Sequence, residues 1–329
     1  MKPLQLTTAI GDYDHTRDLA HGVVRAEGME LRYLNLPLEE IFHRFIKYRE
    51  WDISEMSFGK FVSLASQDDR SLVGIPVFPS RVFRLSSFYV RADGRIQSPA
   101  DLAGARIGIP EWAQTAAIYT RGYIAHELGV PLDAIEWVQA GVNEPGRAEK
   151  VALKLPANLR YRQAPTRCLD DMLLAGEIDV VLSARQPRAF TAGDPRVRRL
   201  FPEFRVAEEA HFRKSGIFPI MHVIALRREV LDEHPWVAMN LLKAFDQAKA
   251  RSLARLADIT ASHAPLPWLA EYVARMQGLF GADPWPYGIE PNRRTLEAFL
   301  AYAWEQGVCH RKLAPEDLFP REVQSAVKV

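Results

Sequence analysis

The order of apolar and polar positions predicts alternating strands and helices in the first two thirds of the chain. Residues 4–10 form a short apolar run typical of a buried strand, and residues 29–36 alternate as a second strand. Apolar side chains then recur at Ile41, Phe45 and Tyr48, a spacing that indicates an amphipathic helix. This alternation of strand and helix predicts an α/β protein with a mostly parallel sheet.

The same rhythm continues toward the middle of the chain. Strands are predicted at residues 71–78, 84–91, 106–109 and 135–138, with a long helix between the last two. Residues 160–184 are interpreted as a helix followed by a strand. The pattern therefore extends through about two hundred residues without an internal repeat.

The last third of the chain is predicted to be mainly helical. This region begins near Arg228 and contains a strong amphipathic segment at residues 231–256. Proline-rich segments at residues 265–269 and 282–288 interrupt it. A chain of 329 residues is long for a single core, so two domains are expected.

Composition narrows the class of protein. The 42 basic and 41 acidic residues give a formal charge of +1, which argues against nucleic-acid binding or attachment to a membrane surface through bulk charge. Cys168 and Cys309 stand in no zinc-binding pattern. No apolar run approaches ~18 residues, and residues 1–15 show no signal-peptide pattern, so we expect a cytoplasmic protein without a membrane span.

Two segments resemble the type 2 periplasmic-binding-protein fold. Residues 101–117, "DLAGARIGIPEWAQTAA", are similar to the entry into its second domain, and residues 216–245 are similar to the return crossing. The resemblance implies an α/β protein with two lobes, a hinge and an interdomain cleft that holds the ligand. Lobe I would comprise residues 1–92 plus 206–329, and lobe II residues 93–205.

A narrower resemblance, to the 4,5-dihydroxyphthalate decarboxylase family, spans nearly the whole chain. It is carried by "FPSRVFRLSSFYVR", "PEWAQTAAIYTRGYIAHELGV", "EWVQAGVNEPGR" and "GIFPIMH". It implies non-oxidative decarboxylation of an aromatic dicarboxylic acid, in the first instance 4,5-dihydroxyphthalate to protocatechuate and CO2. It implies no firm cofactor and leaves a homo-oligomer open. The alternative is a non-catalytic cytoplasmic protein that binds a small aromatic acid.

The loop after the first strand offers the first candidate residues, Asp14, His15 and Arg17. Ligands of open α/β sheets bind outside the carboxyl ends of the strands, where this loop should lie. His15 would then donate a proton or contact a substrate hydroxyl. The plainer interpretation is that Asp14 caps a helix and its neighbours are solvated. A divalent ion at Asp12, Asp14 and His15 is a further alternative, although their spacing matches no metal motif.

Cationic and aromatic candidates follow in the middle of the chain. Arg81 and Arg84 are candidate carboxylate ligands, because a guanidinium matches a carboxylate with two parallel hydrogen bonds. Trp112 and Thr115 precede or begin a helix, where backbone N–H groups favour anions and an indole can stack on an aromatic ring. The alternatives are arginines on an exposed edge strand and a tryptophan packed in the core.

The remaining candidates follow strands of the second lobe or flank the return crossing. Arg147 and Arg185 come after apparent strands and would face the cleft, and His211 is a further candidate substrate contact. A histidine in an apolar run, such as His222, is often a hydrogen-bonded core residue. The family resemblance nevertheless places "GIFPIMH" at the cleft, and histidine titrates near neutral pH. We therefore predict His15 and His222 as the proton-transfer pair.

Overall fold

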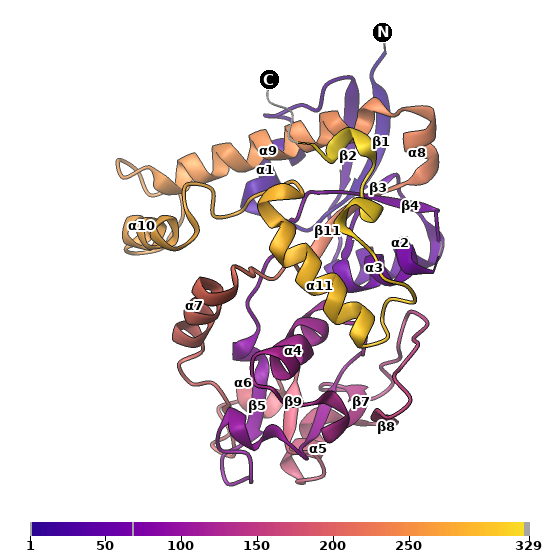
Figure 1. Ribbon diagram of the computed structural model, residues 1–329. Helices are drawn as coiled ribbons and strands as arrows, with labels where there is room; N and C mark the ends of the chain where they lie inside the picture. Colours follow the sequence, from indigo (N-terminus) through magenta and orange to yellow (C-terminus); the bar gives the residue numbers. More distant parts are fainter. Residues whose placement is uncertain (1, 68, 326–329) are drawn as a thin grey trace.

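The computed structural model describes residues 2–67 and 69–325 and shows two α/β lobes, each built on its own sheet (Figure 1). The first sheet has the strand order β2-β1-β3-β11-β4 and the second β10-β5-β9-β6-β7-β8. The two-lobed type 2 fold predicted from the sequence is confirmed. The strands of the first sheet are β1 (Leu4–Ala9), β2 (Met29–Leu34), β3 (Ile53–Ser57), β4 (Leu72–Ile75) and β11 (His222–Arg227). Those of the second are β5 (Phe88–Arg91), β6 (Arg106–Ile109), β7 (Glu136–Gly141), β8 (Arg160–Cys168), β9 (Val180–Leu182) and β10 (Val197–Arg199).

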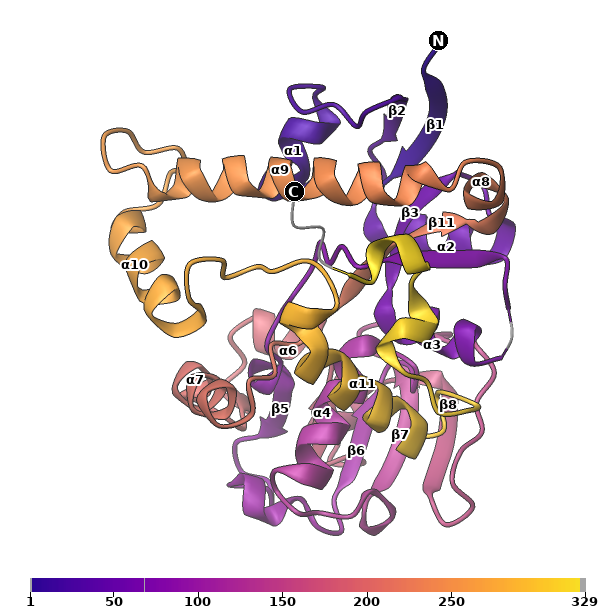
Figure 2. The same cartoon turned by 45° about the horizontal axis from the view of Figure 1, so that its top comes forward.

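Helices cover both sheets and fill the space beside the lobe junction (Figures 1 and 2). In the first half of the chain they are α1 (Asp14–Ala20), α2 (Leu38–Tyr48), α3 (Phe58–Ser66), α4 (Thr115–His126) and α5 (Leu169–Leu174). In the second half they are α6 (Arg188–Thr191), α7 (Phe204–Ser215), α8 (Arg228–Glu233), α9 (Trp236–Ala257), α10 (Leu269–Phe280) and α11 (Arg293–Glu305). The predicted helical character after Arg228 is therefore present.

The first sheet is mixed, and the second is mostly parallel with two antiparallel pairs at one side. β1 pairs in parallel with β2 and β3, and β6 pairs in parallel with β7 and β9. β11 instead runs antiparallel to both of its neighbours, as does β5. β5 and β11 are the strands by which the chain enters a lobe from the other one, so no crossover helix sets their direction.

Residues 160–168, predicted as part of a helix, form the edge strand β8. Most of its side chains are at least partly exposed, and its sequence, "RYRQAPTRC", lacks the apolar alternation of a half-buried strand. It is held by its parallel ladder to β7 rather than by an apolar face. A local pattern therefore could not identify it.

Two crossing segments join the lobes and lie side by side. Residues 76–87 lead from β4 to β5, and residues 216–221 lead from α7 to β11. The amide of Met221 donates to the Ser80 carbonyl at 2.8 Å, so the crossings are hydrogen-bonded to each other. Because β5 belongs to the second sheet, the first crossing ends before Phe88. This pair of crossings has the arrangement of a hinge.

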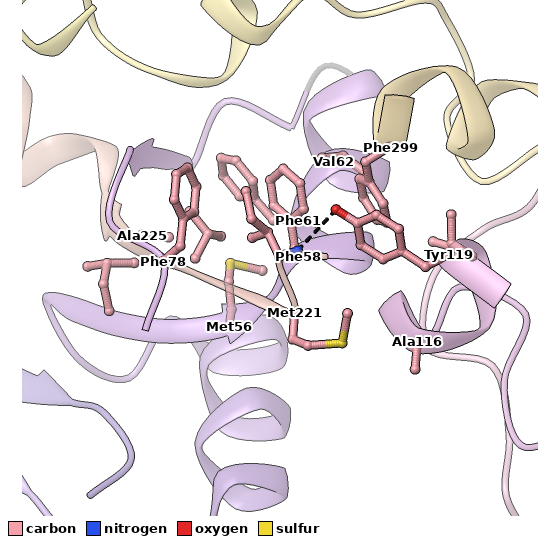
Figure 3. Packing of buried hydrophobic residues seen from close by; sticks show 14 of the residues in the cluster. Met56, Phe58, Phe61, Val62, Phe78, Ala116, Tyr119, Met221, Ala225 and Phe299 are labelled. Atoms are coloured by element: carbon pink, nitrogen blue, oxygen red, sulfur yellow. Dashed lines mark hydrogen bonds between the residues drawn. The ribbon is translucent and has the colours of Figure 1, made fainter. Parts of the chain in front are cut away.

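A single cluster of buried apolar side chains runs through the junction (Figure 3). Tyr119 of α4 packs against Phe299 of α11, whose ring stacks on Phe58 of α3. The Tyr119 hydroxyl also accepts a hydrogen bond of 3.1 Å from the amide of Ile220 in the second crossing. The C-terminal helix α11 thus ties the lobes together on the side where the crossings run.

Candidate active site

Glu55 is the centre of a hydrogen-bonded cluster on β3, the central strand of the first sheet. This carboxylate on β3 is fully buried. Its Oε1 accepts a hydrogen bond of 2.7 Å from the Tyr13 hydroxyl and lies 2.5 Å from Nδ1 of His222. Its Oε2 accepts the amide of Gly11 at 2.8 Å. Because the carboxylate holds the imidazole through Nδ1, Nε2 of His222 is the nitrogen left for a ligand.

His222 lies near Glu55 because the antiparallel strand β11 begins at the carboxyl end of β3. Its Cα pairs with that of Ser57, the last residue of β3, in the antiparallel ladder. Its side chain keeps 18% exposure, and the ring of Phe42 from α2 packs edge-on against it at 4.8 Å. The imidazole is therefore fixed on two sides and partly accessible.

His15 lies beside the same cluster but is held differently. Its Nε2 donates to the carbonyl of Pro79 at 3.0 Å, and its ring lies between those of Tyr13 and Trp285. A carbonyl only accepts, so the remaining nitrogen, Nδ1, carries the lone pair. Burial lowers the pKa of His15, although the Pro79 carbonyl and the Glu55 carboxylate oppose this. The side chain is thus a neutral base near pH 7.

Tyr13 connects the two histidines. Its ring centroid lies 5.3 Å from that of His15, and its hydroxyl bonds the carboxylate that holds His222. Burial raises the pKa of Tyr13, and the negative charge of Glu55 raises it further. Tyr13 therefore remains a phenol that donates to Glu55 rather than a base.

The start of α4 meets the start of α3 across the junction. Oγ1 of Thr115, the first residue of α4, is 2.9 Å from Oγ of Ser57 and accepts the amide of Gly59 at 2.9 Å. Thr115 is thus placed at the lobe junction, beside the strand end that pairs with His222. These contacts join the two lobes at the junction.

The contact at Gly59 leaves no room for a side chain, so Gly59→Ala is expected to hold the lobes apart. A Cβ there would lie 2.7 Å from the Ala113 carbonyl, which belongs to the backbone and cannot rotate away. We expect a larger radius of gyration in small-angle scattering and weaker binding of an aromatic diacid. Gly278→Ala is the matched control, because nothing lies within 4 Å of its Cβ position. Unchanged scattering and binding in Gly59→Ala would show that the cleft does not need this contact.

A pocket of about 300 Å³ opens between the lobes. Lobe I contributes Glu39 from α2. The other lining residues come from the second lobe and are Pro110, Gln114, Gly141, Val142, Asn143, Glu144, Pro145, Gly146, Arg147, Ser183 and Arg185. Both arginines face the same carboxylate. Nη1 of Arg147 is 3.5 Å from one oxygen of Glu39, and Nη2 of Arg185 is 3.1 Å from the other.

The pocket and the histidine cluster are neighbours. Phe42, which packs on His222, lies one turn from Glu39 on α2. Gln114, which lines the pocket, precedes Thr115, and Thr115 bonds the residue that pairs with His222. The pocket and the imidazole are thus connected through α2 and through the start of α4.

A buried carboxylate fixes Arg147 from behind. Glu111 is fully buried, and its oxygens lie 2.5 Å from Nε of Arg147 and 2.7 Å from Nζ of Lys60. Burial raises the pKa of Glu111, but these cations and Lys150 outweigh it and hold that pKa below its usual range. One edge of the Arg147 guanidinium is thus bonded to Glu111, and the other edge faces the pocket.

Two of the predicted site residues lie away from this cleft. Asp14 accepts from Ser252 and pairs with Arg255, both on α9, and Arg17 pairs with Asp14 at the surface. Asp14 therefore attaches α1 to α9, and Arg17 lies on the exposed surface of α1, so neither residue faces the pocket. His15 is the member of this trio that the fold brings to the cluster.

Two further predicted residues are buried in packing. Arg81 is 4% exposed and donates to the carbonyls of Phe218 and Pro286 and to the Asn292 side chain. Trp112 is fully buried, donates to the Gln306 carbonyl and carries the Arg121 guanidinium 3.8 Å above its ring. Neither side chain has the free face that carboxylate binding or ring stacking would require.

Arg84 and His211 line a different pocket, together with Glu208 from α7 and the tyrosines of α4. Nε of Arg84 donates to the sulfur of Met221 at 3.3 Å, and burial lowers the pKa of Arg84 to about 10. The His211 ring packs edge-on against Tyr123. This pocket borders the first crossing and is separate from the two-arginine pocket.

Several residues of the site were not predicted from the sequence. Glu55, Tyr13, Glu39 and Gln114 were passed over, as were Asn143 and Ser183 of the pocket. For Glu55 a signal existed, because "ISEMS" places a carboxylate inside an otherwise buried strand.

Across residues 2–67 and 69–325, no group of three or more His, Cys, Asp or Glu residues is arranged to hold a metal ion. No helix in the same ranges combines the length and apolar character needed to cross a membrane.

Comparison with curated proteins finds two related sequences. A 4,5-dihydroxyphthalate decarboxylase from Comamonas testosteroni is 38% identical over 327 residues, which cover 99% of each chain. A 4,5-dihydroxyphthalate decarboxylase from Pseudomonas putida is 37% identical over 214 residues, which cover 65% of this chain and 83% of the relative. No protein-family model matches the sequence.

Solved structures share the fold. The periplasmic aliphatic sulphonate-binding protein of Escherichia coli superimposes with a TM-score of 0.53 at 13% identity, covering 98% of this chain and 99% of its own. The ligand-binding component of an ABC-type import system from Staphylococcus aureus also gives 0.53 at 13% identity, with 98% of both chains covered. At this identity the likeness defines the two-lobed fold and nothing finer.

Proposed function

Because this chain belongs to the 4,5-dihydroxyphthalate decarboxylase family, we propose that it converts 4,5-dihydroxyphthalate to protocatechuate and CO2 in the cleft between its lobes. The observation that carries the proposal is that the chain combines a Glu55–His222 pair with a pocket that holds two arginines between the lobes. The first arrangement can transfer a proton, and the second can hold a carboxylate.

The chemistry requires a base and an acid on opposite ends of one ring. Direct loss of CO2 would leave an unstable aryl carbanion. Removing the proton from the hydroxyl para to a carboxylate instead pushes an electron pair to the carbon that bears that carboxylate. Protonation of this carbon gives a dearomatised ketone. The C–C bond to the carboxylate then breaks and CO2 leaves, and the electron pair restores the aromatic ring as a phenolate, which takes back the proton held by the base.

The two histidines suit these two tasks. His15 is neutral, with its lone pair on Nδ1, so we assign it as the base for the hydroxyl. His222 is held by Glu55 through Nδ1, so a proton on Nε2 is directed away from that carboxylate. Glu55 also orients the imidazole, as the carboxylate of a catalytic triad does. We assign His222 as the acid that protonates the ring carbon.

Arg147 and Arg185 are assigned to the carboxylate that stays in the product. The departing carboxylate loses its charge as CO2 forms, so a strong cationic contact there would stabilise the reactant more than the transition state. A contact with the retained carboxylate has no such cost. It also orients the ring so that the other carboxylate approaches His222.

The test is to incubate the protein with 4,5-dihydroxyphthalate and to quantify CO2 and protocatechuate. Equal amounts of both products, formed catalytically, support the proposal. Saturable binding without product would instead make the chain a binding protein for an aromatic acid.

The acidic limb of the pH profile of kcat/KM is expected below pH 6.5, the ordinary pKa of histidine. The base must be unprotonated, and burial lowers the pKa of His15, so activity should fall only as the pH drops through that lowered value. The profile is measured from pH 4.5 to 9 at constant ionic strength. A limb above 6.5 would exclude His15 as the base.

A further inference from the structure

Glu39 bridges the two arginines of the pocket from the opposite lobe. It lies in the first turn of α2 and binds Arg147 through one oxygen and Arg185 through the other. A single carboxylate thus joins two guanidiniums in the manner expected of a bound acid. Glu39 is 56% exposed and so can swing out of this position.

We propose that Glu39 is a specificity-determining residue that occupies the place of the ligand's retained carboxylate. This inference rests on the proposed function for the identity of the ligand. An incoming acid must displace Glu39 from both arginines before it can bind them. A ligand without an anionic group at that position leaves the arginines paired with Glu39.

The charges around the pocket support competition rather than co-binding. Nε of Arg147 is already bonded to buried Glu111, so its outer edge serves either Glu39 or a ligand, not both. If Glu39 stayed beside the arginines when a dianion was bound, its carboxylate would repel the carboxylate of the ligand that contacts the same arginines. The class of ligand that should bind this pocket most tightly is therefore an aromatic 1,2-dicarboxylate. One of its carboxylates replaces Glu39, and the other remains available for reaction.

Closure of the lobes does not depend on Glu39 alone. Ser57 contacts Thr115 across the junction, and Lys60 of α3 pairs with Glu111 at 2.7 Å. Both of these contacts are buried, whereas Glu39 and Arg185 are exposed. Removing the charge of Glu39 therefore frees the arginines while these contacts remain.

The experiment compares binding of phthalate, a diacid without the reactive hydroxyls, to the full chain and to Glu39→Gln by calorimetry. Exposed ion pairs are weak, so relief of both pairs is expected to lower the Kd by about two- to tenfold. Glu40→Gln is the matched control, because Glu40 pairs with Arg44 and does not line the pocket.

An equal or higher Kd in Glu39→Gln, no binding of phthalate by either protein, or an equal decrease in Glu40→Gln would overturn the inference. Turnover of 4,5-dihydroxyphthalate is measured separately on the unaltered chain. Tighter phthalate binding by Glu39→Gln without any CO2 release would support the role of Glu39 and reject the decarboxylase assignment, so the two failures are distinguishable.

Discussion

His222→Ala is expected to lower kcat by about 10²–10⁴-fold, the usual contribution of a positioned general acid. The change removes the proton donor that Glu55 orients, so the ring carbon must take its proton from water. The two arginines are untouched, and KM should change far less than kcat. Steady-state kinetics of protocatechuate formation measure both constants.

The control must separate lost chemistry from lost fold, because His222→Ala also removes a hydrogen bond from buried Glu55. Circular dichroism and phthalate binding should match those of the unaltered protein. His263→Ala, on an exposed loop where His263 pairs with Asp258, should keep full turnover. If His222→Ala keeps full turnover as well, His222 is not the acid.

Arg185→Ala is expected to raise KM roughly two- to tenfold with a smaller effect on kcat. The retained carboxylate would lose one of its two cations, and solvent screens the contact of an exposed arginine, so the loss is about 0.5–1 kcal/mol. Arg185 is 66% exposed, so its loss should leave the fold intact. Initial rates over a wide range of substrate concentration give both constants.

Arg196→Ala is the matched control for charge, since Arg196 is 61% exposed and pairs with Asp194 away from the pocket. It should behave like the unaltered protein. Comparable KM values in Arg185→Ala and Arg196→Ala would mean that the two-arginine pocket does not bind the substrate.

The sequence predicts a strand or helix correctly where the side chains of that element alone determine which of its faces is buried. The strand at residues 106–109 and the helix containing Ile41 and Phe45 could be predicted, because apolar spacing reports which face is buried. The edge strand β8 could not, because partner strands rather than its own side chains hold it.

The site was harder to predict because it forms only where residues of one lobe come to lie opposite residues of the other lobe. Arg147 and Arg81 are similar in sequence terms, each an arginine beside a turn or strand. Only the fold shows that Arg147 lines the pocket whereas Arg81 is bonded to carbonyls in the core. Glu39 lies more than a hundred residues from its partners Arg147 and Arg185, so no local pattern could pair them.

The most direct test of the account is a crystal structure of the protein with phthalate bound. We expect one carboxylate on Arg147 and Arg185, and the ring carbon bearing the other within reach of Nε2 of His222. Phthalate found outside this cleft, or bound with both carboxylates remote from His222, would contradict the account.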